Sequence, residues 1–280
     1  MSSTISNTTA FNAYTNYTLN NLNLNSVMRK LATGVKGVVD DGAGVAISER
    51  MKVQANSTAK ARNNADNAIS LLQTADTWMQ QMGDLVAQMH SLAVDSGDAT
   101  KTSTDRSNIQ AEFSGLQAEL TRITSNAAKF NNNAIFDSAG NFQGTATQIG
   151  ADNGQVISID IKGFSSGLNI TGATWGSVAT DISVSLASTA TNSQSVLANA
   201  INFIAQQRAS IGAQQGRFEK TRSGLLSYED QIRSAESKIR SVDTARESSE
   251  MMKYQILSQI GTAMLAQANQ LPAAAVQLVG

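Results

Sequence analysis

Residues 201–240 of the chain are INFIAQQRASIGAQQGRFEKTRSGLLSYEDQIRSAESKIR, and an apolar side chain returns in them at every seventh position. These positions are Ile204, Ile211, Phe218, Leu225, Ile232 and Ile239. A seven-residue apolar repeat is typical of a helix that packs along one seam against another helix. The surrounding pattern predicts one helix from Ser193 to Val242, which at about 1.5 Å per residue would be roughly 75 Å long. Such a helix is too long for a compact globule and indicates a coiled-coil-like rod.

A second seam, made of small residues and methionines, lies between residues 65 and 93. Its positions are Ala65, Leu72, Met79, Val86 and Ala93, with Ala68, Ala75, Met82 and Met89 in between. Asp95-Ser96-Gly97 is expected to end this helix. A third helix carries apolar residues at three- or four-residue spacing from Ile109 to Ala127, and we expect Thr104 or Asp105 to cap its first turn. We expect the seams through Leu72, Met79, Val86, Phe218, Leu225 and Ile232 to hold the rod together.

Both ends of the chain also have helical periodicity, but amides interrupt their apolar stripes at Asn21 and Gln267. The C-terminal helix is expected to stop at Pro272. Two such helices bury little apolar surface, and the free energy gained does not offset the conformational entropy lost when the chain becomes ordered. We therefore expect them to pair weakly in one molecule. Many copies could cover the stripes completely, and a head-to-tail contact that does not close produces a helical filament. The apolar positions expected to carry subunit assembly are Leu24, Met28, Leu31, Leu257, Ile260, Met264 and Leu271.

The middle of the chain changes from helical periodicity to turns and alternation. Residues 146–149 and 156–161 flank Ala151-Asp152-Asn153-Gly154, and Asn-Gly suits the tight turn of a β-hairpin. Residues 163–192 are rich in Ser, Thr and Gly and predict loops with room for one more short strand. The predicted fold is therefore mainly α: an elongated antiparallel helical bundle or coiled coil, with a small β-hairpin region in the middle and paired N- and C-terminal helices.

Composition excludes several classes of function. The chain of 280 residues has no Cys and one His, which leaves no disulfide, thiolate or Cys/His metal site, and we expect no cofactor and no metal. The formal net charge of -1 does not indicate the excess of positive charge that is typical of proteins that bind nucleic acid. No segment approaches the roughly 18 apolar residues of a membrane-spanning helix, and the first twenty residues lack the pattern of a cleaved signal. No cluster of nucleophile, base or metal ligands is evident in the sequence, so we expect no enzymatic activity.

Several stretches resemble the signatures of bacterial flagellin. They are DDGAGVAISERM at residues 40–51, RNNADNAISLLQTA at 62–75, QIGADNGQ at 148–155, RASIGAQQ at 208–215 and LAQANQLP at 265–272. The resemblance covers both ends of the family pattern and most of the chain. It implies a structural subunit that self-assembles into the flagellar filament for motility. It also implies an extracellular protein, exported through the flagellar type III apparatus without a cleaved signal peptide.

The same resemblance implies partners and a domain organisation. The partners are other copies of the chain, an export chaperone, the filament cap and the hook-junction proteins. Residues 1–40 and 245–280 would form inner-core coiled-coil helices, and residues 41–162 and 193–244 a helical rod domain with the hairpin. Residues 163–192 would be a short loop-rich outer segment, because so few residues leave no room for a large outer domain.

The chain departs from the family pattern at two places. The loop between Gly34 and Asp40 is shorter than usual, and Val39 stands where a Lys is common. In the helix similar to the innate-receptor-binding patch, Leu92 and Glu112 match, but Gln88 stands where an Arg is usual. We therefore expect weak recognition by the receptor.

Two other interpretations remain at this stage. A hook–filament junction protein is also helical at both ends, although the SERM and LAQANQ motifs would not be expected together in one. A helical binding module or adhesin would work as a monomer or small oligomer and would not polymerise. Growth of long polymers distinguishes a filament subunit from both.

Overall fold

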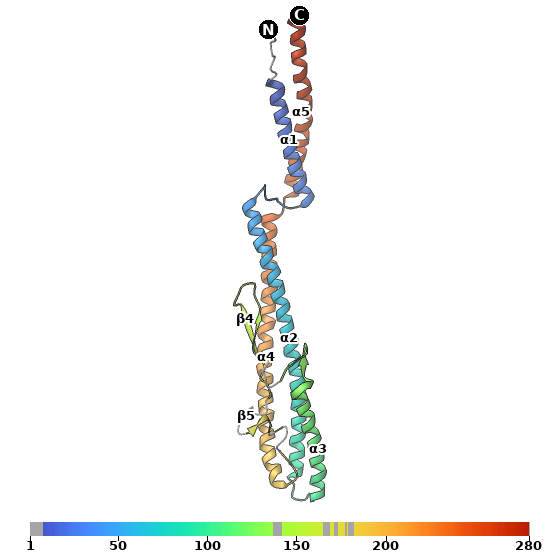
Figure 1. Cartoon of the computed structure of the whole chain (residues 1–280), viewed down its shortest axis with the longest axis vertical. Helices are drawn as coiled ribbons and strands as arrows, with labels where there is room; N and C mark the ends of the chain where they lie inside the picture. Colours follow the sequence, from blue (N-terminus) through green and yellow to red (C-terminus); the bar gives the residue numbers. More distant parts are fainter. Residues whose placement is uncertain are drawn as a thin grey trace. The chain divides into compact units, whose positions relative to one another are not determined.

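The computed structural model describes residues 8–136, 142–164, 169–170, 173–176, 178 and 182–279 (Figure 1). The α-helices in these ranges are α1 (Thr8–Thr33), α2 (Gly42–Ser96), α3 (Ser103–Arg122), α4 (Ala187–Arg240) and α5 (Thr244–Val279). A single π-helical turn, η1 (Ile123–Ala127), extends α3. The strands are β1 (Lys129–Phe130), β2 (Asn133–Ala134), β3 (Gln143–Gln148), β4 (Val156–Asp160), β5 (Asn169–Ile170) and β6 (Ala173–Thr174). The mainly helical fold predicted from the sequence is confirmed.

The chain forms two compact units, which we call the terminal unit and the central unit. The terminal unit contains residues 1–53 and 231–280, and the central unit contains residues 54–230. The long helices α2 and α4 each contribute to both units, since their residues lie on both sides of these boundaries.

In the central unit, α2 and α4 pack side by side in opposite directions. Arg208 Nε lies 2.7 Å from Asp76 Oδ1, and Arg222 Nε lies 2.7 Å from Asp66 Oδ1. The amide Nε2 of Gln194 donates to the carbonyl of Ala93 at 3.0 Å. Residues nearer the C-terminus of α4 contact residues nearer the N-terminus of α2. The two helices are therefore antiparallel.

The core of the central unit follows the two apolar seams. Leu72, Met79, Val86 and Phe218 have no exposed surface, and Leu225, farther along α4, is half-buried. From α3, Phe113 and Leu120 complete this core. Small Ala side chains in α2 let the neighbouring helices approach, and the methionines fill the remaining space.

The predicted β-hairpin is present and lies in the central unit. Strands β3 and β4 are antiparallel, with Gln148 opposite Val156 and Thr147 opposite Ile157. Gly154 has a φ of +85°, a conformation that glycine adopts without strain. The hairpin is fixed to α4 by Gln214, whose side chain accepts from Asp160 N at 2.9 Å and donates to Asp160 O at 3.0 Å. The side-chain amide of Gln214 therefore makes the two backbone hydrogen bonds at Asp160 that a neighbouring strand would otherwise make.

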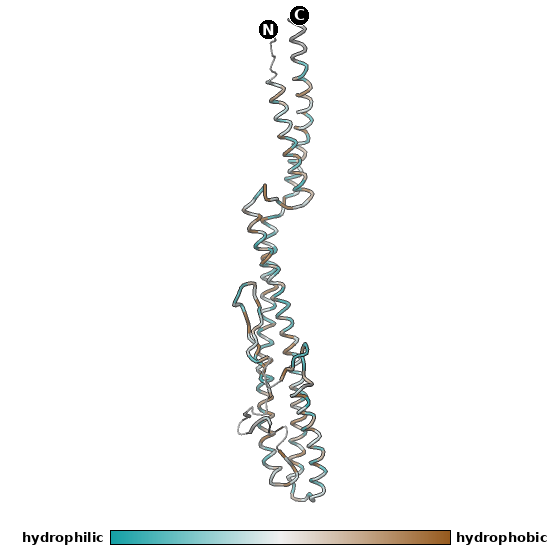
Figure 2. Tube along the Cα trace, viewed as in Figure 1, coloured by the Kyte–Doolittle hydropathy of each residue, from teal (hydrophilic) through white to brown (hydrophobic). Residues whose placement is uncertain are grey.

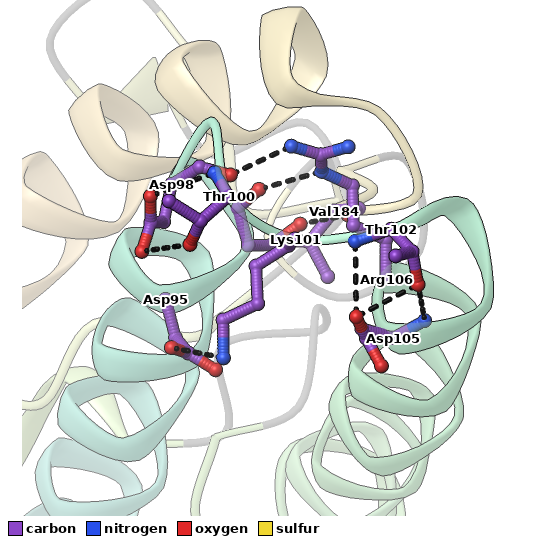
Figure 3. A network of polar contacts seen from close by, with 9 residues as sticks. Asp95, Asp98, Thr100, Lys101, Thr102, Asp105, Arg106 and Val184 are labelled. Carbon is purple, nitrogen blue, oxygen red and sulfur yellow. Dashed lines mark hydrogen bonds and ion pairs between the residues drawn. The ribbon is translucent and has the colours of Figure 1, made fainter.

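The turn between α2 and α3 is held by side chains (Figure 3). Arg106 donates to the carbonyls of Ser96 at 2.9 Å and Asp98 at 2.7 Å. Thr102 is the N-cap of α3, and it forms a capping box with Asp105. The prediction of Thr104 or Asp105 as the cap was wrong, because Asp105 lies at the third helical position, where its carboxylate accepts a hydrogen bond from Thr102 N at 2.9 Å.

Three segments differ from the sequence expectation. Helix α4 begins at Ala187, before the predicted Ser193, and ends at Arg240, before the predicted Val242. Helix α5 does not stop at Pro272 but continues to Val279. The residues after the proline are Ala273, Ala274 and Ala275, strong helix formers that offset the single lost hydrogen bond.

Residues 163–192 were expected to form loops, but the described Trp175 and Phe164 in this range are buried, and their ring centroids lie 4.5 Å apart. These aromatic residues belong to the core of the central unit.

Candidate assembly surface

The terminal unit is built on α1 and α5, which lie side by side in Figure 1. Ser258 Oγ donates to Asn21 Oδ1 at 3.3 Å, and Lys30 Nζ lies 3.8 Å from Glu247 Oε1. The two helices therefore run in opposite directions, as the sequence predicted. Asn21, which interrupts the apolar stripe, contributes a hydrogen bond across the pair, and a polar pair of this kind fixes the register of two helices.

Close approach of the two helices depends on a glycine. A Cβ placed on Gly261 of α5 would lie 3.1 Å from Tyr17 Cδ2 and 3.4 Å from Tyr17 Cβ. The 3.1 Å distance is tighter than ordinary van der Waals contact, so the ring of Tyr17 occupies the space that a side chain would take.

The α1–α5 pair has almost no core of its own. Among the side chains of α1 and α5 that the structure describes, Val27 and Ala268 are the buried apolar ones. In Figure 2, hydrophobic and hydrophilic residues alternate closely along both helices. Two helices with so little buried surface gain little free energy from packing.

Instead, α5 presents a continuous apolar stripe to solvent. Met252, Ile256, Ile260 and Met264 follow each other at four-residue spacing, and each is between 52% and 56% exposed. We call these four residues the α5 stripe. Helix α1 adds further exposed apolar side chains, namely Phe11, Tyr14, Leu19, Leu22 and Met28. A monomeric protein rarely exposes so many large apolar residues on one pair of helices, and such surfaces mark interaction sites.

The structure separates the residues expected to carry assembly into two groups. Met28, Ile260 and Met264 are exposed, whereas Leu24, Leu31 and Leu257 are half-buried. The side chain of Leu271 lies outside the described residues.

Sequence reasoning missed Met252 and Ile256, because it followed the three-and-four spacing that runs through Leu257. The four-residue interval that links these residues to Ile260 and Met264 would have revealed the α5 stripe.

The loop of residues 34–41 is anchored within the terminal unit. Lys36 N donates to Arg240 O at 2.9 Å, and Val242 N donates to Gly34 O at 3.1 Å, so the loop pairs with the link between α4 and α5. Gly34 has a φ of +69° and ends α1. Val39 follows in this loop with 97% of its surface exposed, which adds to the exposed apolar surface of α1 and α5.

Carboxylates close this loop and begin α2. Asp41 Oδ1 accepts from Gly44 N at 2.8 Å, which makes it the cap of the helix. Desolvation raises the pKa of Asp40, but the hydrogen bond from Gly37 N and the nearby Lys30 outweigh it and hold that pKa below the ordinary value. Lys30 Nζ lies 3.3 Å from Asp40 Oδ1.

The other candidate residues occupy two places. Gln88 and Glu112 are exposed on α2 and α3, and Leu92 is half-buried against the core of the central unit. Ile232, on the part of α4 that belongs to the terminal unit, is buried.

Within the described ranges, none of the helices combines the length and the apolar character needed to cross a membrane.

Comparisons with known proteins cover nearly the whole chain. The family model for the bacterial flagellin N-terminal helical region matches residues 5–141, and the model for the C-terminal helical region matches residues 194–279. Flagellin of Bacillus subtilis is 35% identical over 299 residues, covering 98% of each chain. Flagellin of Halalkalibacterium halodurans is 32% identical over 278 residues, also covering 98% of each chain.

Among solved structures, a protein assigned as a flagellar hook-associated protein of Vibrio parahaemolyticus has a TM-score of 0.59. The match covers 72% of this chain and 100% of that one, at 12% sequence identity. At this identity the likeness supports the fold alone.

Proposed function

The chain belongs to the bacterial flagellin family, and from that premise we infer that α1 and α5 supply the contacts through which its copies assemble. The protein is a structural subunit of the bacterial flagellar filament and self-assembles into it. What the family does not specify is which residues of this chain make the contacts.

The observation that carries the proposal is the α5 stripe. Each of its four apolar side chains keeps more than half of its surface exposed in the described part of the chain. Burying a large apolar side chain stabilises an assembly by about 1.5–3 kcal/mol relative to leaving it exposed. Many copies in a filament could cover the stripe of every subunit but the last ones. Met28 on α1 and Val39 in the neighbouring loop offer further apolar surface of the same kind.

The half-buried positions have a different role in this proposal. Leu24, Leu31 and Leu257 are partly covered within the α1–α5 pair and would keep the two helices in register while neighbouring subunits approach. Leu271 is proposed as an assembly residue from the sequence pattern. The packing of the central unit, through Leu72, Met79, Val86, Phe218 and Leu225, keeps the subunit rigid enough to be added as one piece.

We propose the domain organisation that the family resemblance implies. Residues 1–40 and 245–280 would form the inner core of the filament, residues 41–162 and 193–244 the rod, and residues 163–192 a short outer segment. The poor core of α1 and α5 supports the inner-core role, since such helices need neighbours to be stable.

We further propose that the chain is secreted through the flagellar type III apparatus without a cleaved signal and is not an enzyme. Its partners during export and growth would be a chaperone, the filament cap and the hook-junction proteins. A chaperone that binds the exposed apolar surface of α5 before export would prevent premature association.

Seeded growth tests the assembly proposal. The double variant Ile256→Ser/Ile260→Ser should keep its helical content by circular dichroism, because both side chains are exposed in the subunit. It should fail to sediment with sheared fragments of the parent filament. The matched control is Leu226→Ser, which removes a comparably exposed apolar residue from α4 in the central unit and should assemble normally. Normal growth of the double variant would refute the role of the α5 stripe.

We also propose that an innate receptor recognises the subunit weakly, because Gln88 lacks the charge of the usual Arg. A receptor-reporter assay on the monomer should give low potency, and Gln88→Arg should raise it. Full potency of the parent chain would contradict this proposal.

A further inference from the structure

The methionines of the chain are divided between the two units. In the central unit, Met79, Met82 and Met89 have no exposed surface. Every methionine that is exposed in the described ranges lies in the terminal unit, and these are Met28 at 49%, Met252 at 54% and Met264 at 54%.

The exposed methionines lie on the apolar surface described above. Met252 and Met264 form the two ends of the α5 stripe, with Ile256 and Ile260 between them. Met28 is on α1, the helix paired with α5. Methionine is flexible and polarizable, which suits a surface that must adapt to a neighbouring molecule. The same thioether is also open to oxidation when it is exposed to solvent.

We propose that Met28, Met252 and Met264 are the sites at which a peroxide oxidises the unassembled subunit, and that their oxidation blocks self-assembly. The thioether sulfur attacks one peroxide oxygen, the S–O bond forms and the O–O bond breaks. Sulfur is oxidised by two electrons to the sulfoxide, and hydrogen peroxide is reduced to water. The inference rests on the proposed function, because it concerns the surface through which copies associate.

Burial determines which methionines react. A peroxide reaches Met79, Met82 and Met89 only when the core of the central unit opens, and core elements open with free energies that approach global unfolding. The terminal methionines need no opening in the free subunit. In an assembled filament the same residues would be covered, so oxidation would act on subunits before they are added.

The sulfoxide weakens assembly through desolvation. It converts an apolar side chain into a polar one without adding net charge. Burying that polar oxygen against a neighbouring apolar surface costs free energy unless it finds a hydrogen-bond donor. Because the α5 stripe has a methionine at each end, oxidation shortens the apolar surface from both sides. The change is reversible by methionine sulfoxide reductases.

The experiment treats the unassembled full-length chain with hydrogen peroxide and maps the products by peptide mass spectrometry. Each oxidised methionine gains about 16 Da, the mass of one oxygen atom. Met28, Met252 and Met264 should gain this mass well before Met79, Met82 and Met89. The treated chain should lose most of its growth on sheared filament seeds, and sulfoxide reductases should restore it.

Two variants separate these methionines from the others. Met28→Leu/Met252→Leu/Met264→Leu conserves apolar volume and cannot form a sulfoxide at these positions, so its growth on seeds, whatever its level, should be the same before and after peroxide treatment. The control Met51→Leu/Met251→Leu changes two half-buried methionines of the terminal unit and should remain as sensitive as the parent.

The outcomes distinguish the two proposals. Equal oxidation of core and terminal methionines overturns the inference, as does normal growth after complete oxidation of the three sites or loss of growth by the peroxide-treated triple variant. Should the triple variant fail to assemble untreated, restoration of the oxidised parent by the reductases decides the question. An untreated parent chain that never adds to seeds overturns the proposed function instead.

Discussion

The terminal and central units pair long antiparallel helices, yet one has a core and the other does not. The contiguous apolar core lies entirely within the central unit, where α2 and α4 are joined by α3 and by the β-hairpin. In the terminal unit, the buried apolar residues among those described are Val27, Ile232 and Ala268. The comparison teaches that helix pairing alone does not stabilise a unit. A third layer that covers the apolar seam does.

Side-chain chemistry at the two helix pairs explains the difference. In the central unit, Met82 of α2 and Phe218 of α4 both lie on the seam without exposed surface. Across the terminal pair, the contacts that define the register are Asn21 with Ser258 and the glycine at position 261 against Tyr17. Polar and small residues specify how two helices meet but contribute little apolar burial. The terminal pair is therefore specific in its geometry and poor in intrinsic stability.

The largest effect that separates the two units should come from Phe218→Ala. Removing this fully buried ring from the central unit leaves a cavity and should lower the free energy of unfolding by about 3–5 kcal/mol. The matching truncation Ile260→Ala in the terminal unit should change the stability of the monomer by less than about 0.5 kcal/mol. Urea unfolding followed by circular dichroism measures both. Equal losses would mean that the two units have comparable cores.

A smaller effect is expected where the hairpin joins α4. Gln214→Met keeps the length of the side chain but removes both hydrogen bonds to Asp160, and it should cost about 1–3 kcal/mol because one backbone donor and one acceptor lose their partner. Faster hydrogen exchange of β3 and β4 amides is the specific readout. Gln215→Met is the control, because its side chain bonds to Glu219 on the same helix. Unchanged exchange in the hairpin would show that Gln214 does not hold it.

Much of this comparison was accessible from the sequence. Heptad positions such as Met79, Met82 and Ile211 predicted the core of the central unit, because periodicity reports which face of a helix is buried. Asn153-Gly154 predicted the hairpin through its turn chemistry. The burial of Trp175 was not predictable, since it lies in a Ser/Thr/Gly-rich segment without periodicity. The same holds for Gln214, because a polar residue on a seam gives no sign of which backbone it will bond.

The candidate surface was predicted only in part, for a related reason. The sequence identified the apolar positions of α5, but it could not separate Leu257, which is half-buried, from Ile260, which is exposed. Both fit the same periodic pattern. Only the position of α1 determines which of them it covers. Exposure in the subunit is a property of the pair, and one helix considered alone does not reveal it.

Acid should affect the ordered turn of the central unit. Bonds from the Thr102 side chain and backbone lower the pKa of Asp105, and the Thr100 backbone N–H lowers the pKa of Asp98. Carboxylates with a lowered folded pKa stabilise the protein above their unfolded pKa, and this contribution is lost as pH falls through the folded value. We expect Thr102→Ala to cost about 1 kcal/mol at neutral pH, from loss of the cap, and less in acid.

Melting temperatures of the parent and of Thr102→Ala, compared at neutral pH and below the ordinary pKa of Asp, measure this difference. The control Thr104→Ala removes a neighbouring exposed Thr that does not cap the helix. A constant gap between parent and Thr102→Ala across the pH range would show that the capping box does not depend on an ionised Asp105.

The smallest effect compares one glycine from each unit. Gly216, on α4 in the central unit, has open space where a Cβ would be, so Gly216→Ala should stabilise the helix by up to about 1 kcal/mol. Gly261→Ala in the terminal unit gains the same helix propensity, but its methyl group would press on Tyr17, so its net gain should be smaller or absent. Thermal unfolding measures the stability change of each variant, and amide exchange in α1 reports whether α1 and α5 have separated. If Gly261→Ala stabilises as much as Gly216→Ala and α1 exchange is unchanged, the α1–α5 contact at Tyr17 is looser than the structure indicates, and the terminal pair owes its register to polar contacts such as Asn21 with Ser258 and Lys30 with Glu247.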